Sequence, residues 1–96
     1  MKYGALGLIE VLGSSNAVLV VDQLLKAADV QFKTWNCKCG GHVTIFINGD
    51  VSAVTAAVDS VKNNPPCSVF NTAVISSPSD ETAKWAEESA KKNNFA

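Results

Sequence analysis

The sequence predicts a small α/β domain, an α+β sandwich in which strands and helices follow the order βαββαβ. Three observations predict it. The 96 residues fit one domain. Segments in which every second residue is apolar, as in strands, follow segments in which apolar residues recur every three or four positions, as in helices. Turn-forming residues separate these segments. We therefore expect one antiparallel or mixed sheet with helices packed on one side, followed by a polar C-terminal helix or tail.

The first half of the chain is expected to contain a strand, a helix and a second strand. Gly4–Glu10 is a short apolar run that ends in a charge, which suits a buried strand. Possible capping residues follow at 13–16, and apolar residues at helical spacing then predict a helix over Ala17–Ala28. Val30–Trp35 alternates apolar and polar residues, which is typical of a half-exposed strand.

The second half repeats this pattern in the order strand, helix, strand. His42–Ile47 is rich in strand-forming residues, and Asn48-Gly49-Asp50 ends it with turn residues. Val51–Lys62 has helical spacing and is stopped by the Asn-Asn-Pro-Pro run at 63–66. Cys67–Ile75 is the expected last strand.

A polar segment closes the chain. Residues 76–80 have turn and cap chemistry, and Asp80–Asn93 is a charged helix or tail that contains Trp85. We place the domain at residues 3–78 and the polar C-terminal helix or tail at 79–96.

Composition limits the classes of function. The chain is 47% hydrophobic and 18% charged, below the ~25% charged that is usual, which favours burial of surface between subunits. A formal net charge of −1 argues against a nucleic-acid or membrane-surface partner. Met1–Val11 lacks the pattern of a signal peptide, and the apolar runs are too short to span a bilayer. Three cysteines then suggest free thiols in a reducing cytoplasm.

The segment Trp35–Gly41 carries the clearest chemical signal. It holds Cys37 and Cys39, two of the three cysteines, beside two glycines. Thiolates this close suggest metal, iron–sulfur or redox chemistry, yet one Cys-x-Cys cannot complete a four-thiolate site. Zinc suits the same ligands. One of the two thiols can bind a metal while the other packs or supports it.

Other polar residues do not form a catalytic set. Asp22 and Glu10 have no accompanying nucleophile, so we expect that the chain is not an enzyme. His42 is interpreted as a surface or packing histidine, and Cys67 as a buried apolar thiol. Trp35 is expected to anchor an interface or the core.

Several segments together resemble the shell-protein domain of bacterial microcompartments, of the type that forms hexamers. They cover roughly residues 4 to 78, and their order and spacing are more specific than any one of them. The segments are Ala5–Glu10, Gly13, Val21–Ala28, Val30, Val43-Thr44, Gly49–Val51, Ala53-Val54, Ala56-Ala57 and Val74-Ile75.

The resemblance implies a cyclic homohexamer that tiles with other shell proteins around encapsulated enzymes in the cytoplasm. It implies a central pore lined by the loop Cys37–Gly41. Similar cysteine-bearing loops occur in shell proteins of glycyl-radical-enzyme microcompartments, which bind an iron–sulfur cluster in the pore. The resemblance thus makes Cys37 and Cys39 candidate ligands of a cluster, of the 4Fe–4S type, shared between subunits. The residues it places along the pore are Asn36, Lys38, Gly40 and Gly41.

Six copies of the loop would supply the thiolates that one chain lacks, with only part of the ring used at a time. The cluster would pass electrons to a partner or encapsulated enzyme, or sense redox state across the shell. Lys26 aligns with the edge lysine through which such hexamers meet, whereas Ser77 stands where the family has an edge arginine. Two alternatives stay open: a metabolite pore without a cluster, and a small monomeric redox or metal carrier.

Overall fold

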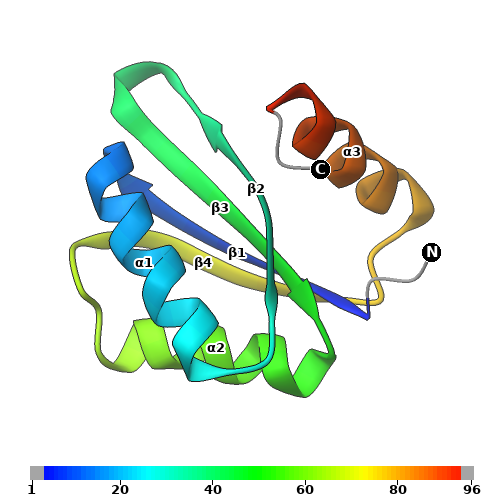
Figure 1. Cartoon of the computed structure of the whole chain (residues 1–96), viewed down its shortest axis with the longest axis horizontal. Coiled ribbons are helices and arrows are strands. Elements are labelled where there is room, and N and C mark those ends of the chain that lie inside the picture. Colours follow the sequence, from blue (N-terminus) through cyan, green and yellow to red (C-terminus); the bar gives the residue numbers. More distant parts are fainter. Residues whose placement is uncertain (1–3, 94–96) are drawn as a thin grey trace.

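In the computed structural model, which describes residues 4–93, one four-stranded sheet lies between two helices on one face and a third on the other (Figure 1). The elements are β1 (Ala5–Leu12), α1 (Ser14–Ala27), β2 (Gln31–Cys37), η1 (Cys39–Gly41), β3 (His42–Gly49), α2 (Val51–Asn63), β4 (Val69–Ser76) and α3 (Asp80–Lys92). The strand order is β2-β3-β1-β4, and the three pairings of these strands are antiparallel. The predicted βαββαβ order is confirmed, with a sheet that is antiparallel rather than mixed.

The main core lies between the sheet and the helices α1 and α2. Alternate residues of the two central strands face these helices, and Ile9 and Ile45 are fully buried there. Leu24 of α1 and Val54 of α2 pack onto them with no exposed surface. The helical periods read from the sequence therefore mark the true core faces, and Trp35 packs against this core as expected.

The helix α3 packs on the opposite face of the sheet, whereas α1 and α2 lie together on one side as expected. Its small buried residues Ala86 and Ala90 lie on this face, and Ala86 joins Leu6 of β1 in a second apolar cluster. Phe46 of β3 meets Trp85 edge to face, with ring centroids 5.0 Å apart. A polar tail can cover a sheet in this way because alanines allow close approach while the charges stay outside.

An ion pair between Lys33 of β2 and Glu87 adds to the docking of α3. The Lys33 side chain is only 17% exposed, and burial lowers the pKa of its ammonium even though a carboxylate is close.

Several boundaries differ from the expected ones. β1 and β3 each end two residues later, at Leu12 and Gly49. β2 continues to Cys37 rather than ending at Trp35, because the hairpin pairing extends to Cys37 opposite Val43. α1 begins at Ser14, directly after Gly13, whose φ of 87° places it outside the helix. β4 begins at Val69, which leaves Cys67 partly buried in the preceding loop.

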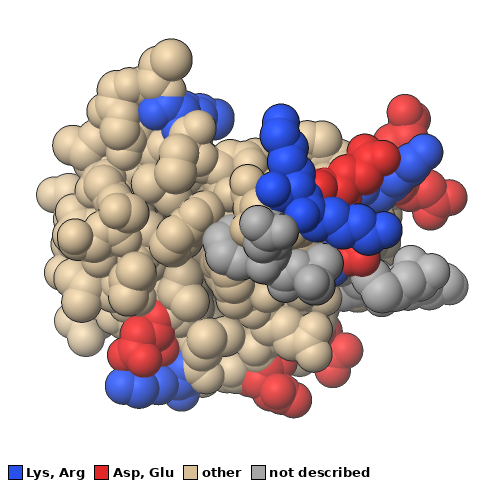
Figure 2. Space-filling model, turned by 45° about the horizontal axis from the view of Figure 1, so that its top comes forward, with Lys and Arg blue, Asp and Glu red and all other residues tan. Residues whose placement is uncertain are grey.

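Charge is unevenly distributed over the surface. Seven of the 17 charged residues lie on α3. Figure 2 shows the largest group of charged side chains at one end of the molecule and smaller groups at its lower edge and upper left, with an uncharged area between them. Within residues 4–93, no helix has both the length and the apolar character needed to cross a membrane.

Candidate functional site

The two cysteines lie at the tip of the β2–β3 hairpin. Cys37 is the last residue of β2, and Cys39 begins one turn of 3₁₀ helix that ends at Gly41. The Lys38 N–H donates to the His42 carbonyl at 2.7 Å, and the Gly41 N–H donates to the Lys38 carbonyl at 3.2 Å. The tip is therefore a short hydrogen-bonded turn and not an open loop.

The two glycines make this turn possible. Gly40 and Gly41 both have φ of 84°, a left-handed conformation that other residues adopt at a cost. The Gly41 carbonyl also accepts a hydrogen bond from the Gly13 N–H at 2.8 Å, which ties the tip to the start of α1.

Both thiols of the tip are exposed. Lys38 between them is extended, with φ −116° and ψ 166°, and residues two positions apart in an extended chain lie on the same face. Within residues 4–93, no three His, Cys, Asp or Glu side chains gather where they could hold one metal ion. A metal centre at this tip therefore needs ligands from further chains.

The histidine beside the tip contacts two side chains. His42 Nδ1 lies 2.9 Å from Glu10 Oε2, although the angle is not that of a hydrogen bond. Its ring lies 5.0 Å from the Phe70 ring. Glu10 is thus remote from Asp22, whose carboxylate pairs with Lys26 at 2.9 Å on the exposed face of α1. The structure does not bring the two acids together, in agreement with the interpretation that they form no catalytic pair.

Lys26, the expected edge contact, and Ser77, which stands at the position of the family's edge arginine, are both at the surface. Lys26 occupies the last turn of α1, and the contact with Asp22 raises the pKa of its exposed ammonium. Ser77 follows β4 with φ of 51°, and its N–H donates to the Gly4 carbonyl at 2.8 Å.

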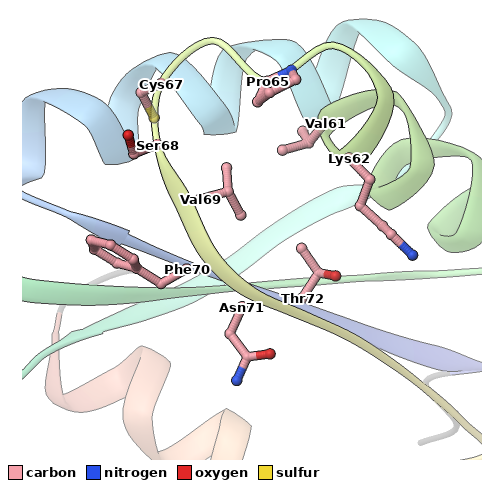
Figure 3. Close-up of a pocket in the computed structure, with 9 residues that line it drawn as sticks. All are labelled: Val61, Lys62, Pro65, Cys67, Ser68, Val69, Phe70, Asn71 and Thr72. Atoms are coloured by element: carbon pink, nitrogen blue, oxygen red, sulfur yellow. The ribbon is translucent and has the colours of Figure 1, made fainter.

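The strand β4 forms an unprotected edge of the sheet. Its eight residues carry no charge, and a hollow of about 600 Å³ runs beside it, lined by residues of β4, by Cys67 and by Val61 and Lys62 of α2 (Figure 3). Phe70 is 53% exposed, and Val74 and Ile75 are each 38% exposed. An exposed, uncharged edge strand invites pairing with another chain, so this edge is suited to an interface.

A second hollow, of about 670 Å³, is lined by residues from the end of β2 and from α3. Asn36 and Cys37 border it from the strand, and Ser89 and Asn93 border it from the helix. The sequence pointed to Asn36 but not to Ser89 or Asn93, because these residues are more than 50 positions away from β2 along the chain.

This fold and this hairpin are those of a known family. Residues 5–78 match the model of the BMC domain. The chain belongs to the BMC domain family. It is 41% identical over 58 residues to the carboxysome shell protein CsoS1B of Hydrogenovibrio crunogenus, covering 59% of this chain and 60% of the relative. It is 37% identical over 60 residues to the bacterial microcompartment shell protein PduA of Citrobacter freundii, covering 62% of this chain and 64% of the relative.

A solved BMC-type structure agrees with the fold. A microcompartment protein from Desulfitobacterium hafniense DCB superposes with a TM-score of 0.76 at 26% identity, covering 93% of this chain and 48% of that one. The matches to CsoS1B and PduA thus span about three fifths of those relatives' length. Both relatives are named as shell proteins, in agreement with the expectation of a non-enzymatic BMC domain.

Proposed function

We propose that this BMC domain is a tile of a microcompartment shell in the cytoplasm, a cyclic hexamer whose pore is lined by the tip Cys37–Gly41. We further propose that the thiolates of this tip hold an iron–sulfur cluster on the ring axis. The observation that carries the proposal is the tip itself: two exposed thiols on a tight hairpin, in a chain whose described residues offer no third ligand nearby.

Two different apolar surfaces support a ring. α1 packs over β3, β1 and β2 and exposes Val18, Leu19 and Leu25. β4, an edge strand of the sheet, exposes Phe70, Val74 and Ile75. Contact between unlike surfaces of identical chains is head-to-tail, and such contacts close into rings when the rotation permits. The relatives CsoS1B and PduA are named as shell proteins, which favours closed rings that tile with each other and with sister shell proteins.

A ring solves the shortage of ligands. A cluster of the 4Fe–4S type takes about four thiolates, and six tips around one axis offer more than enough. Six equivalent tips cannot all bind a tetrahedral cluster in the same way, so we propose that only part of the ring binds at a time. The cluster would exchange electrons with a partner inside or outside the shell, or sense redox state. Zinc is the rival metal at the same thiolates.

Anaerobic purification tests the cluster. We expect a brown hexamer that contains iron and labile sulfide, and loss of most of the iron in Cys37→Ser or Cys39→Ser or in both. The matched control is Cys67→Ser, which removes the thiol in the loop before β4. This variant is expected to keep its iron. Iron content, sulfide content and the visible spectrum of the sized oligomer are the measurements. A colourless wild-type protein after reconstitution, or equal iron in the double variant, would reject the cluster.

A metabolite pore without a cluster is the second candidate. The exposed Lys38 would be repeated around the proposed ring and would attract anions to it. A colourless hexamer favours this function, and a hexamer that binds zinc alone favours zinc as the metal. A stable monomer whose two thiols form a titratable disulfide would instead support a small redox carrier and overturn the shell proposal.

A further inference from the structure

The end of α3 holds the strand segment that leads directly into the cysteine tip. The Asn93 side-chain amide donates to the Trp35 carbonyl at 3.0 Å. The Ser89 hydroxyl donates to Asn36 Oδ1 at 3.1 Å, and the hydroxyls of Ser89 and Thr34 are also 3.1 Å apart. We call Thr34, Asn36, Ser89 and Asn93 the polar clamp.

Several hydrogen bonds join the residues of the polar clamp. The Ser89 hydroxyl donates to Asn36 Oδ1. The Thr34 hydroxyl has a single hydrogen and lies 3.1 Å from the Ser89 hydroxyl and 3.4 Å from the Trp35 carbonyl. Asn93 Nδ2 in turn donates to Thr34 Oγ1 at 3.3 Å. Thr34 is fully buried and Ser89 nearly so, and a buried hydroxyl that loses its partner is costly.

The polar clamp also completes an edge strand. β2 is an outer strand of the sheet, so part of its backbone has no neighbouring strand to pair with. Asn93 supplies a donor to the Trp35 carbonyl, and Ser89 fixes the side chain of the next residue. On the other side of Cys37, the Lys38 N–H is bonded to the His42 carbonyl. Cys37 therefore lies between two points at which the chain is fixed.

The last turns of α3 are held by the polar clamp, by the ion pair of Glu87 with Lys33 and by a small apolar face. The buried face of its last turns consists of Ala86, Ser89 and Ala90, and the hollow of about 670 Å³ adjoins the polar clamp. A helix with so little buried apolar surface belongs to the part of a fold that opens most readily. Whether α3 is docked on the sheet is thereby linked to how well ordered the cysteine tip is.

We propose that Ser89 and Asn93 are positioning residues for the cysteine tip. They fix Thr34–Asn36, and hence the direction in which Cys37 leaves β2, so that docking of α3 controls the order of the candidate metal ligands. The consequence for a bound metal rests on the function proposed above. The effect of α3 on the order of the tip, which we call the mechanical link, does not.

Amide hydrogen exchange on the iron-free assembly tests the link. We expect the Lys38 amide to exchange about fivefold faster in Ser89→Ala and in Asn93→Asp, the change that follows from losing one or two modest hydrogen bonds. Asn93→Asp keeps the size of an exposed side chain, so it preserves the fold even if Ser89→Ala does not. Ser89→Thr keeps the hydroxyl and is expected to restore slow exchange.

Glu87→Gln is the matched control, because it weakens the ion pair of α3 with Lys33 and leaves the polar clamp intact. It is expected to leave exchange at Lys38 within about twofold of wild type. Exchange unchanged in both Ser89→Ala and Asn93→Asp would overturn the proposal, as would equal acceleration by Glu87→Gln.

A second measurement separates this proposal from the cluster. In anaerobically loaded protein, Ser89→Ala is expected to shift the midpoint potential or broaden the electron paramagnetic resonance signal of the cluster, because ligand orientation tunes the metal. If the Lys38 amide exchanges faster while the cluster signal is unchanged, the proposal that α3 controls the order of the metal ligands is overturned. Absence of iron in the wild type would count against the proposed function and leave the exchange result to decide the mechanical link.

Discussion

Gly7→Val is expected to destabilise the fold by about 3 kcal/mol or more, a large part of the stability of a domain this size. Gly7 lies in the central strand β1 and faces α2. A Cβ built on it would come within 2.9 Å of both Ile47 Cγ1 and Val54 Cγ1 and within 3.1 Å of Val58 Cγ2. These are branched side chains with restricted rotamers, so they cannot move aside without shifting α2 from the sheet. The measurement is the free energy of unfolding in urea.

A double-mutant cycle is the control for this prediction. Gly7→Ala alone is expected to cost about 1 kcal/mol, and Val54→Ala alone should cost a similar amount through the space that it leaves. Since Val54→Ala removes one of the two closest atoms, the double variant should be clearly more stable than the sum of the single effects predicts. Strictly additive effects, or a Gly7→Val protein as stable as wild type, would contradict the close packing of α2 on β1.

The order of elements could be predicted because it depends on local patterns. The apolar period identified the core faces of α1 and α2, and Asn48-Gly49-Asp50 marked the end of β3. The place of α3 could not be predicted, because a segment rich in charge gives no sign of which surface its few alanines contact. Ser89 and Thr34 meet from positions 55 residues apart, and neither belongs to a motif.

The residues that form the candidate tip could be predicted from the sequence, and the residues that surround the tip could not. The spacing of Cys37 and Cys39 and the two glycines after them are local, and the structure places them at one hairpin tip as expected. The limits of the tip were less accurate, since strand pairing continues through Cys37. Pairing energy depends on the partner strand, which the residues of β2 alone do not specify.

Val74→Lys is expected to convert the proposed hexamer into monomers at micromolar concentration while the subunit remains folded. Val74 lies on the uncharged edge strand β4 and is 38% exposed in the single chain. An ammonium buried without a partner costs a few kcal/mol at each contact, which weakens association by roughly 100-fold or more. In a single chain the long lysine side chain can reach water, so the fold itself should lose little stability. Mass in solution by light scattering is the measurement.

The matched control is Glu88→Lys, which adds a lysine to the exposed face of α3 on a residue outside both apolar surfaces. It is expected to leave the oligomer intact. A second charge on the other surface, Leu19→Glu on α1, should dissociate the ring when introduced alone. If α1 and β4 are the two halves of one head-to-tail contact, a mixture of Val74→Lys and Leu19→Glu chains should recover dimers through the one contact in which the new charges are opposite. A Val74→Lys protein that remains hexameric would exclude β4 from the ring contact, and the thiols of the tip would then have to meet through another surface.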